Sequence, residues 1–173
     1  PLLAGFVLGG LVAAVVGVLF GLPSARIKGF YLIVSTLAAQ FLIQWVFTHF
    51  GWFSNFNASG VISAPPLVIG SLNFGSPSGR YLLTLAIVAA LTWLAHLLVR
   101  SDLGRHWIAV RDMDTAAAAI GIPVVRAKLA AFAISSFYLG IAGALWAFTY
   151  LGTVEPHGFD LTRSFQVLFI III

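Results

Sequence analysis

The polar residues between positions 111 and 123 are the part of this chain whose types and spacing best suit a specific interaction. The candidate contact residues are Arg111, Asp112, Asp114, Ala116, Ala117 and Gly121. The charged members carry both signs and can form ion pairs with another protein. The alanine run favours a short helix, and Gly121 followed by Pro123 favours its end. The pattern predicts a helix that docks on a partner; the alternative is a solvated loop rich in alanine.

The remaining reactive side chains form no recognisable catalytic pattern. The serines at positions 24, 35, 135 and 136 have no arrangement of histidine and carboxylate that the sequence alone can assemble. The four histidines lack metal-ligand spacing, and the chain contains no cysteine. A Gly-Lys-Ser or Gly-Lys-Thr phosphate loop is also absent, so any ATP that powers this protein must be bound by a separate subunit. We therefore expect no enzyme, no metal site and no cofactor.

Gln40 and Gln44 form the strongest polar pair inside an apolar stretch. They lie one helical turn apart and so share a face of a helix. In lipid a side-chain amide must find a partner, either on a neighbouring helix or on a solute that passes by. Both residues are candidates for the pathway, and helix packing is the alternative. All five acidic residues lie outside the long apolar stretches, which argues against a carrier coupled to protons or ions.

The composition indicates a membrane protein. Hydrophobic residues make up 61% of the chain and charged residues 8%, against roughly 45–50% and about 25% in soluble domains. The net charge of +4 is not concentrated on a soluble face, because the basic residues lie between apolar stretches. We therefore expect a lipid bilayer as the surroundings and no nucleic acid as a partner.

Four apolar stretches are long enough to cross a bilayer, since a core of ~30 Å requires about 20 helical residues. They are residues 2–22, 29–50, 81–99 and 129–151. Residues 164–173 are also apolar but cover only about half of a bilayer. The predicted fold is all-α: a polytopic transmembrane helical bundle with four complete spans and a truncated fifth. We expect the chain to be a fragment that is cut inside this last span, and cut near Pro1 as well.

The basic residues predict the orientation of these spans. Those in the first and third connections are Arg26, Lys28, Arg100, Arg105, Arg111, Arg126 and Lys128, and only Arg80 and Arg163 lie in the others. Connections rich in lysine and arginine face the cytoplasm. The sequence therefore predicts that Arg26 and Asp114 are cytoplasmic and that Asn57, Glu155 and Asp160 lie outside.

Small residues recur at helical spacing in the first and fourth spans. The motifs are Gly5-xxx-Gly9, Gly17-xxx-Gly21 and the group Gly140, Gly143 and Ala144. Such residues let helices approach closely in lipid, so we expect packing within the chain, with a dimer interface as the alternative. The connection of residues 51–79 is rich in glycine, proline, asparagine and serine, which excludes one continuous helix. Its apolar part, residues 66–74, can form an interfacial or re-entrant piece.

The polar loop and the stretches around it resemble a known family. The residues that carry the resemblance are Gly104-Arg105, Arg111-Asp112, Asp114, Ala116-Ala117 and Gly121, then Arg126 through Phe132, Ser135 and Gly140 through Leu145, and earlier Arg26 through Tyr31 and Thr36 through Ala38. Together they are similar to the permeases of branched-chain amino acid ABC transporters. In importer permeases the corresponding loop docks into a groove on the ATPase subunit. The resemblance covers nearly the whole chain.

The resemblance implies that residues 1–173 are a fragment of an ABC importer permease domain and that residues 100–128 are a cytoplasmic loop with an ATPase-coupling helix. The implied function is import of branched-chain or other hydrophobic amino acids across the bacterial cytoplasmic (inner) membrane. The implied partners are ATP-binding cassette subunits, a second homologous permease subunit and a periplasmic or extracellular solute-binding protein. The alternatives are a permease for urea, short amides or another small polar solute, a channel or carrier without an ATPase, and a membrane-anchored assembly subunit.

The chain departs from the family pattern at a few positions. Asp114 stands where the loop usually carries glutamate, and Ala118 stands where a second acidic residue is common. In the outer connection only Gly60 and Pro65 match the family well. These departures leave the substrate open and predict one contact fewer with the ATPase.

Overall fold

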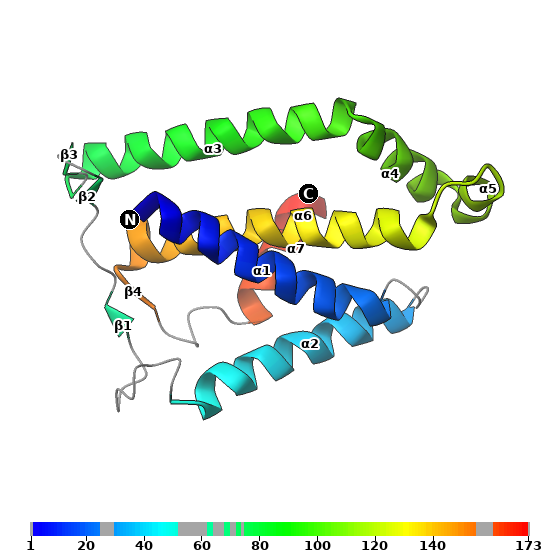
Figure 1. The fold of residues 1–173 in the computed structure, drawn as a ribbon. Coiled ribbons are helices and arrows are strands. Elements are labelled where there is room, and N and C mark those ends of the chain that lie inside the picture. The colour runs from blue at the N-terminus through cyan, green and yellow to red at the C-terminus, as the bar shows by residue number, and fades with distance from the viewer. Residues whose placement is uncertain are drawn as a thin grey trace.

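The computed structural model describes residues 2–24, 30–51, 62–63, 68–69, 72–73, 75–154 and 161–172, and Figure 1 shows its fold. The helices are α1 (Leu2–Ser24), α2 (Phe30–His49), α3 (Pro77–Arg100), α4 (Asp102–Asp112), α5 (Asp114–Ala119), α6 (Val124–Leu145), η1 (Trp146–Leu151) and α7 (Leu161–Ile172). The long helices α1, α2, α3 and α6 run along the length of the molecule, and α4 and α5 lie together at one end (Figure 1).

Short strands lie at the opposite end of the molecule from α5 (Figure 1). The strands are β1 (Ile62–Ser63), β2 (Val68–Ile69), β3 (Leu72–Asn73) and β4 (Thr153–Val154). β1 pairs with β4 and β2 with β3, both antiparallel. The all-α prediction did not include these strands. They arise because a connection rich in glycine and proline cannot continue a helix, while its backbone groups still need hydrogen-bond partners.

The most extensive packing in the molecule joins α1 to α6, which cross each other in Figure 1. A Cβ added to Gly17 of α1 would collide with the side chain of Ser136, and one added to Gly140 of α6 would lie 2.6 Å from the Cβ of Ala13. Glycine is therefore needed at both positions for the helix backbones to approach this closely.

The remaining glycines of the two α1 motifs differ in how closely they approach α6. A Cβ added to Gly21 would lie 3.1 Å from the side chain of Phe132, whereas at Gly5 and Gly9 it would meet nothing within 4 Å. The prediction of packing within the chain is thus confirmed for the motif at Gly17 and Gly21. In the motif at Gly5 and Gly9, the backbone carbonyl of Gly9 lies close to Gly140 of α6, whereas Gly5 makes no such contact among the residues that the structure describes.

A hydrophobic cluster and a hydrogen bond hold α3 against this helix pair. The cluster contains the buried residues Phe6, Ile141 and Leu145, with Ile87, Leu91, Phe137, Ala144 and Phe148 packed around them. The Tyr138 hydroxyl of α6 donates a hydrogen bond of 3.0 Å to the backbone carbonyl of Leu91 in α3. Helix α6 therefore contacts both α1 and α3 and is the centre of the bundle.

Three helical segments among the described residues are long and apolar enough to cross a membrane. They are Leu3–Pro23, Pro77–Arg100 and Val124–Leu151. They correspond to the first, third and fourth predicted spans, the last beginning earlier than expected. Many of their large apolar side chains are exposed. A surface this apolar suits contact with lipid or with other helices better than contact with water. The second predicted stretch forms α2, a helix of 20 residues that is not among these three.

The segment Val124–Leu151 ends in a π-helix, η1. In η1 the amide of Gly152 bonds to the carbonyl of Ala147 at 2.9 Å, the wider spacing that defines this helix type. Gly152 then adopts a φ of +67°, which an L side chain resists. The segment therefore ends abruptly, and β4 follows at once.

Candidate functional site

The helices α4 and α5 form a hairpin beyond the end of α3, and a sharp corner fixes where it starts. Ser101 lies between α3 and α4, and its hydroxyl donates a hydrogen bond of 2.6 Å to the carbonyl of Leu98. Gly104 is buried in the first turn of α4, and a Cβ there would collide with the backbone carbonyl of Val99. In the sequence Gly104 reads only as a poor helix former, whereas the structure shows that it makes this corner possible.

The chain breaks between α4 and α5 at Met113. Helix propensity is high throughout residues 103–120, yet Met113 has an extended conformation with φ −152° and ψ 101°. Its amide bonds to the carbonyl of Ala109 at 3.1 Å, and its carbonyl accepts from Ala117 at 3.0 Å. Each bond pairs one backbone group at a helix end, and α5 folds back toward the start of α6 (Figure 1).

Ala117 is turned into the protein rather than toward a partner. It is only 2% exposed and packs with Val110 of α4 and Ala127 of α6. A methyl group at this position lets three helices meet closely. The neighbouring candidate, Ala116, is exposed. The sequence could not distinguish these alanines. Of the two candidate contact residues only Ala116 is exposed in this structure, and the part of both in ATPase coupling stays a prediction.

The end of α5 agrees with the stop signal in the sequence. Gly121 adopts a φ of +89°, its amide bonds to the carbonyl of Ala118, and the Ile122 amide bonds to the carbonyl of Ala117. Such bonds satisfy the last carbonyls of a helix through a residue in the left-handed region. The predicted helix end at Gly121 is confirmed.

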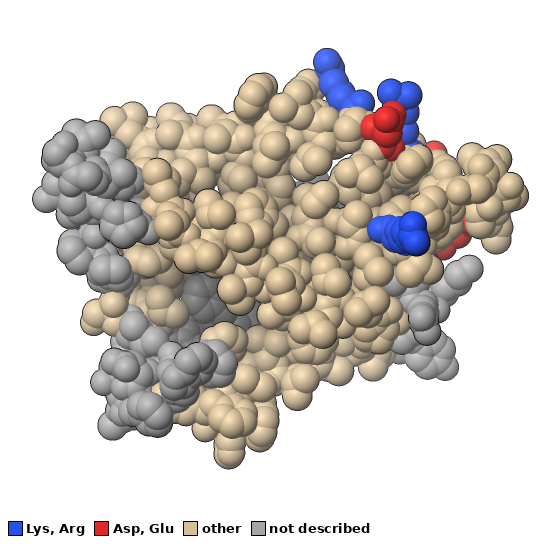
Figure 2. Space-filling model, viewed as in Figure 1, with Lys and Arg blue, Asp and Glu red and all other residues tan. Residues whose placement is uncertain are grey.

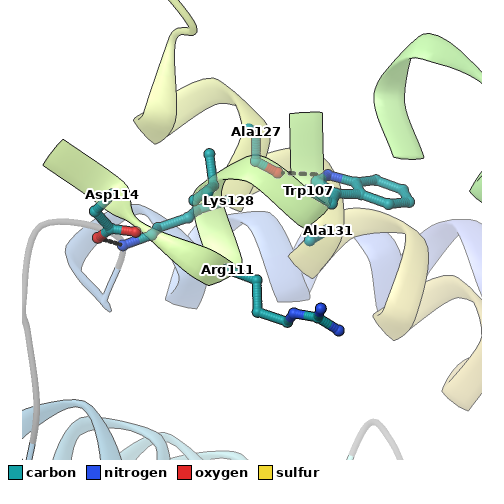
Figure 3. A pocket seen from close by; sticks show the side chains of 7 residues that line it. Trp107, Arg111, Asp114, Ala127, Lys128 and Ala131 are labelled. Carbon is teal, nitrogen blue, oxygen red and sulfur yellow. Dashed lines mark hydrogen bonds and ion pairs between the residues drawn. The ribbon is translucent and has the colours of Figure 1, made fainter. Parts of the chain in front are cut away.

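Two polar contacts attach the hairpin to the first turns of α6, and Figure 3 shows both. The Lys128 ammonium lies 2.6 Å from the Oδ2 of Asp114. The Trp107 indole Nε1–H donates a hydrogen bond of 2.9 Å to the backbone carbonyl of Ala127. Sequence reasoning identified Asp114 but missed Trp107 and Lys128, because residues far apart in the chain give no local signal of contact.

Arg111 and Asp112 lie at the exposed end of α4. Their side chains are 77% and 62% exposed and form an ion pair of 3.1 Å between neighbours in the chain. In Figure 3 Arg111 points away from Asp114 and Lys128. A pocket of about 300 Å³ opens beside it, lined by Trp107, Val110, Arg111, Asp114, Ala127, Lys128 and Ala131.

Large apolar side chains are exposed at the tip of the hairpin. Met113 is 64% exposed and Ile120 is 74% exposed, although neither lies in a segment apolar enough to cross a membrane. We call Met113, Ala116 and Ile120 the hairpin tip. Charged side chains gather near the same end of the molecule on the face in Figure 2. Exposed apolar residues rimmed by charges are typical of surfaces that bind another protein.

The pathway candidates Gln40 and Gln44 lie on a different part of the molecule. Both are half-buried residues of α2, a helix that packs against α1. The structure thus brings the hairpin candidates together with one another and leaves the two glutamines apart from them. In the part of the chain that the structure describes, no group of His, Cys, Asp or Glu could hold a metal ion.

Comparison with known proteins identifies the family. All of residues 1–173 match the family described as "Branched-chain amino acid transport system / permease component". The high-affinity branched-chain amino acid transport system permease protein LivM of Salmonella typhimurium is 30% identical over 189 residues, which cover 96% of this chain and 44% of that protein. LivM of Escherichia coli is 29% identical over 187 residues, covering 95% of this chain and 44% of that protein.

The chain therefore spans less than half the length of the curated relatives that it matches. No solved structure matches it. The predicted resemblance and the assignment as a transport subunit rather than an enzyme are confirmed by the family match. The relatives are bacterial proteins, and the apolar helices agree with a multi-pass membrane permease. The chain belongs to the family of permease components of branched-chain amino acid transport systems.

Proposed function

We propose that this chain is part of an ABC importer permease that moves branched-chain or other hydrophobic amino acids across the bacterial cytoplasmic membrane. In this proposal α1, α2, α3 and α6 with η1 are complete spans and α7 is part of a fifth. The strand end faces outward, where a solute-binding protein delivers the amino acid. The α4–α5 hairpin faces the cytoplasm, where separate subunits bind and hydrolyse ATP.

The hairpin is the observation that supports this proposal most directly. Its tip presents the apolar side chains of Met113 and Ile120 beyond the end of a membrane span. Arg111 and Asp112 supply exposed charges of both signs at the rim. A soluble subunit with an apolar groove and a polar rim would bury the first set and pair with the second.

The packing of the other helices supports a path by which motion of the docked hairpin would reach the membrane helices. The hairpin contacts the first turns of α6, and α6 packs closely on α1 and bonds to α3. A displacement of the hairpin by the ATPase would therefore move a central helix of the bundle. A second homologous permease subunit would complete the pathway, and Gln40 and Gln44 on α2 are the candidates of this chain to line it.

The function is tested with the full-length permease in liposomes, together with its second permease subunit, ATPase subunits and solute-binding protein. We expect uptake of radiolabelled leucine that requires both ATP on the hairpin side and the binding protein. Leucine uptake without ATP would contradict the proposal in favour of a channel or carrier. Uptake of urea or acetamide in place of leucine would contradict the substrate class.

A variant of the hairpin tip tests the docking surface. Ile120→Asp places a charge where the proposal buries an apolar side chain, and should weaken ATPase association about tenfold, or ~1.4 kcal/mol. The matched control is Leu103→Asp, an exposed apolar position at the start of α4, which should leave association unchanged. Equal co-purification of the ATPase with both variants would remove the hairpin tip from the interface.

A further inference from the structure

One ion pair differs from the others that the structure describes. Asp102 with Arg105 and Arg111 with Asp112 are each close in sequence, on α4, and strongly exposed. The pair of Lys128 with Asp114 joins two helices, and each side chain is only 28% exposed. In this partly protected site a charge pair is screened less by solvent than an exposed pair. Its short N···O distance of 2.6 Å is that of a charge-assisted hydrogen bond.

Two further contacts beside this pair join the same two parts of the molecule. Trp107 of α4 donates its indole hydrogen bond to Ala127, the residue before Lys128. Ala127 also packs with the buried Ala117 of α5. Three contacts thus hold the hairpin to the start of α6: the hydrogen bond from Trp107 of α4, the ion pair of Asp114 of α5, and the packing of Ala117 on Ala127.

We propose that Lys128 is a positioning residue that clamps α5 to α6, so that a force on the hairpin moves α6 as one body with it. This inference rests on the proposed function, since the force would come from the ATPase. It changes the role of Asp114: the carboxylate faces inward to Lys128 (Figure 3), and its acidic character serves the chain's own geometry. The docking contacts are then left to the hairpin tip and to Arg111 and Asp112.

The test is a charge reversal in the full-length permease, assembled with its partners in liposomes. The variants are Asp114→Lys, Lys128→Asp and the two combined. Each single variant places like charges side by side and should lower the amount of solute moved per ATP hydrolysed several-fold. The combined variant restores an opposite pair. It should recover most of the coupling.

A second measurement is made on the permease without its ATPase. Hydrogen exchange at the amides of residue 117 in α5 and residues 120–122 just after it, which are hydrogen-bonded, should speed up in each single variant and slow again in the combined one. The control is Asp102→Asn, which removes an exposed pair within α4 and should change neither exchange in α5 nor coupling.

The outcomes separate the clamp from the proposed function. Rescue of exchange together with coupling supports the clamp. Rescue of exchange without rescue of coupling would mean that Asp114 contacts the ATPase directly, and would overturn the positioning role. Failure to rescue exchange would overturn the clamp itself. If the unaltered permease bound no ATPase while exchange followed the expected pattern, the proposed function would fail and the clamp would stand.

Discussion

At the scale of single residues, two glycines shape the hairpin for different physical reasons. Gly104 is needed because a side chain would strike the backbone at the corner between α3 and α4. Gly121 has open space around it, and an added Cβ would meet nothing within 4 Å. Its φ of +89° is the requirement there, since an L residue in the left-handed region costs about 1–2 kcal/mol. Glycine is thus required at position 104 for lack of space and at position 121 for its backbone conformation.

Gly121→Ala should destabilise the α5 end of the hairpin by about 1–2 kcal/mol without a clash, because the penalty comes only from backbone conformation. Gly121→Asn is the matched control, since asparagine adopts positive φ more readily than alanine, and it should cost less. Hydrogen exchange at the amides of residues 120–122 in the purified permease measures both effects. Equal exchange in the alanine and asparagine variants would contradict the conformational explanation.

At the scale of elements, α6 connects the site to the bundle. Its first turns carry the contacts to the hairpin, its middle packs against α1 across Gly17 and Gly140, and Tyr138 bonds to α3. In lipid, helices associate through close packing and hydrogen bonds rather than through the hydrophobic effect. The fit of small residues between α1 and α6 is therefore the main source of their association.

Gly17→Leu should disrupt this packing, since added bulk in a tight contact typically costs about 1–3 kcal/mol. We expect a lower thermal unfolding temperature of the purified permease. Gly5→Leu, in the same helix, adds the same side chain where a Cβ meets nothing within 4 Å, and should leave that temperature nearly unchanged. If Gly5→Leu were the more damaging variant, α1 would instead pack mainly through its Gly5 face, against another subunit.

At the scale of the whole molecule, charge and apolar surface are separated along its length. The charged side chains visible in Figure 2 gather toward the hairpin end, while the long helices expose mostly apolar side chains. Arg80, at the start of α3, lies at the other end of that helix from Arg100. This asymmetry matches the distribution of basic residues that orients membrane proteins. Arg26, Asn57, Glu155 and Asp160, which were also used to predict the orientation, lie outside the described residues.

Single cysteines in this cysteine-free chain test the orientation. Ala118→Cys on α5 and Ser78→Cys at the start of α3 are both exposed positions, so neither should disturb packing. In intact cells that make the full-length protein, an impermeant thiol reagent should label position 78. It should label position 118 only after the cells are opened. Labelling of position 118 from outside would reverse the proposed orientation and place the hairpin away from ATP.

The sequence by itself determined the features that depend on neighbours along the chain. Uninterrupted apolar stretches predicted membrane-spanning helices because the free energy of transfer into lipid is a sum over neighbouring side chains. Gly121 and Pro123 predicted the end of α5 because helix termination is also a local event. The family resemblance comes from several short motifs between Arg26 and Leu145, each of which consists of neighbouring residues. The apolar stretch predicted at residues 129–151 starts later than α6, because a helix can begin at polar residues, here with Arg126 and Lys128 in its first turns, before its apolar part.

Only the tertiary structure decided which of these residues meet. Ala116 and Ala117 are identical in type and adjacent in sequence, yet one is exposed and the other is 2% exposed. The difference comes from the break at Met113, which turns α5 against Val110 and Ala127. The pairing of Asp114 with Lys128 and of Trp107 with Ala127 likewise depends on how three helices pack. No local propensity encodes such contacts, because their free energy exists only once distant segments have come together.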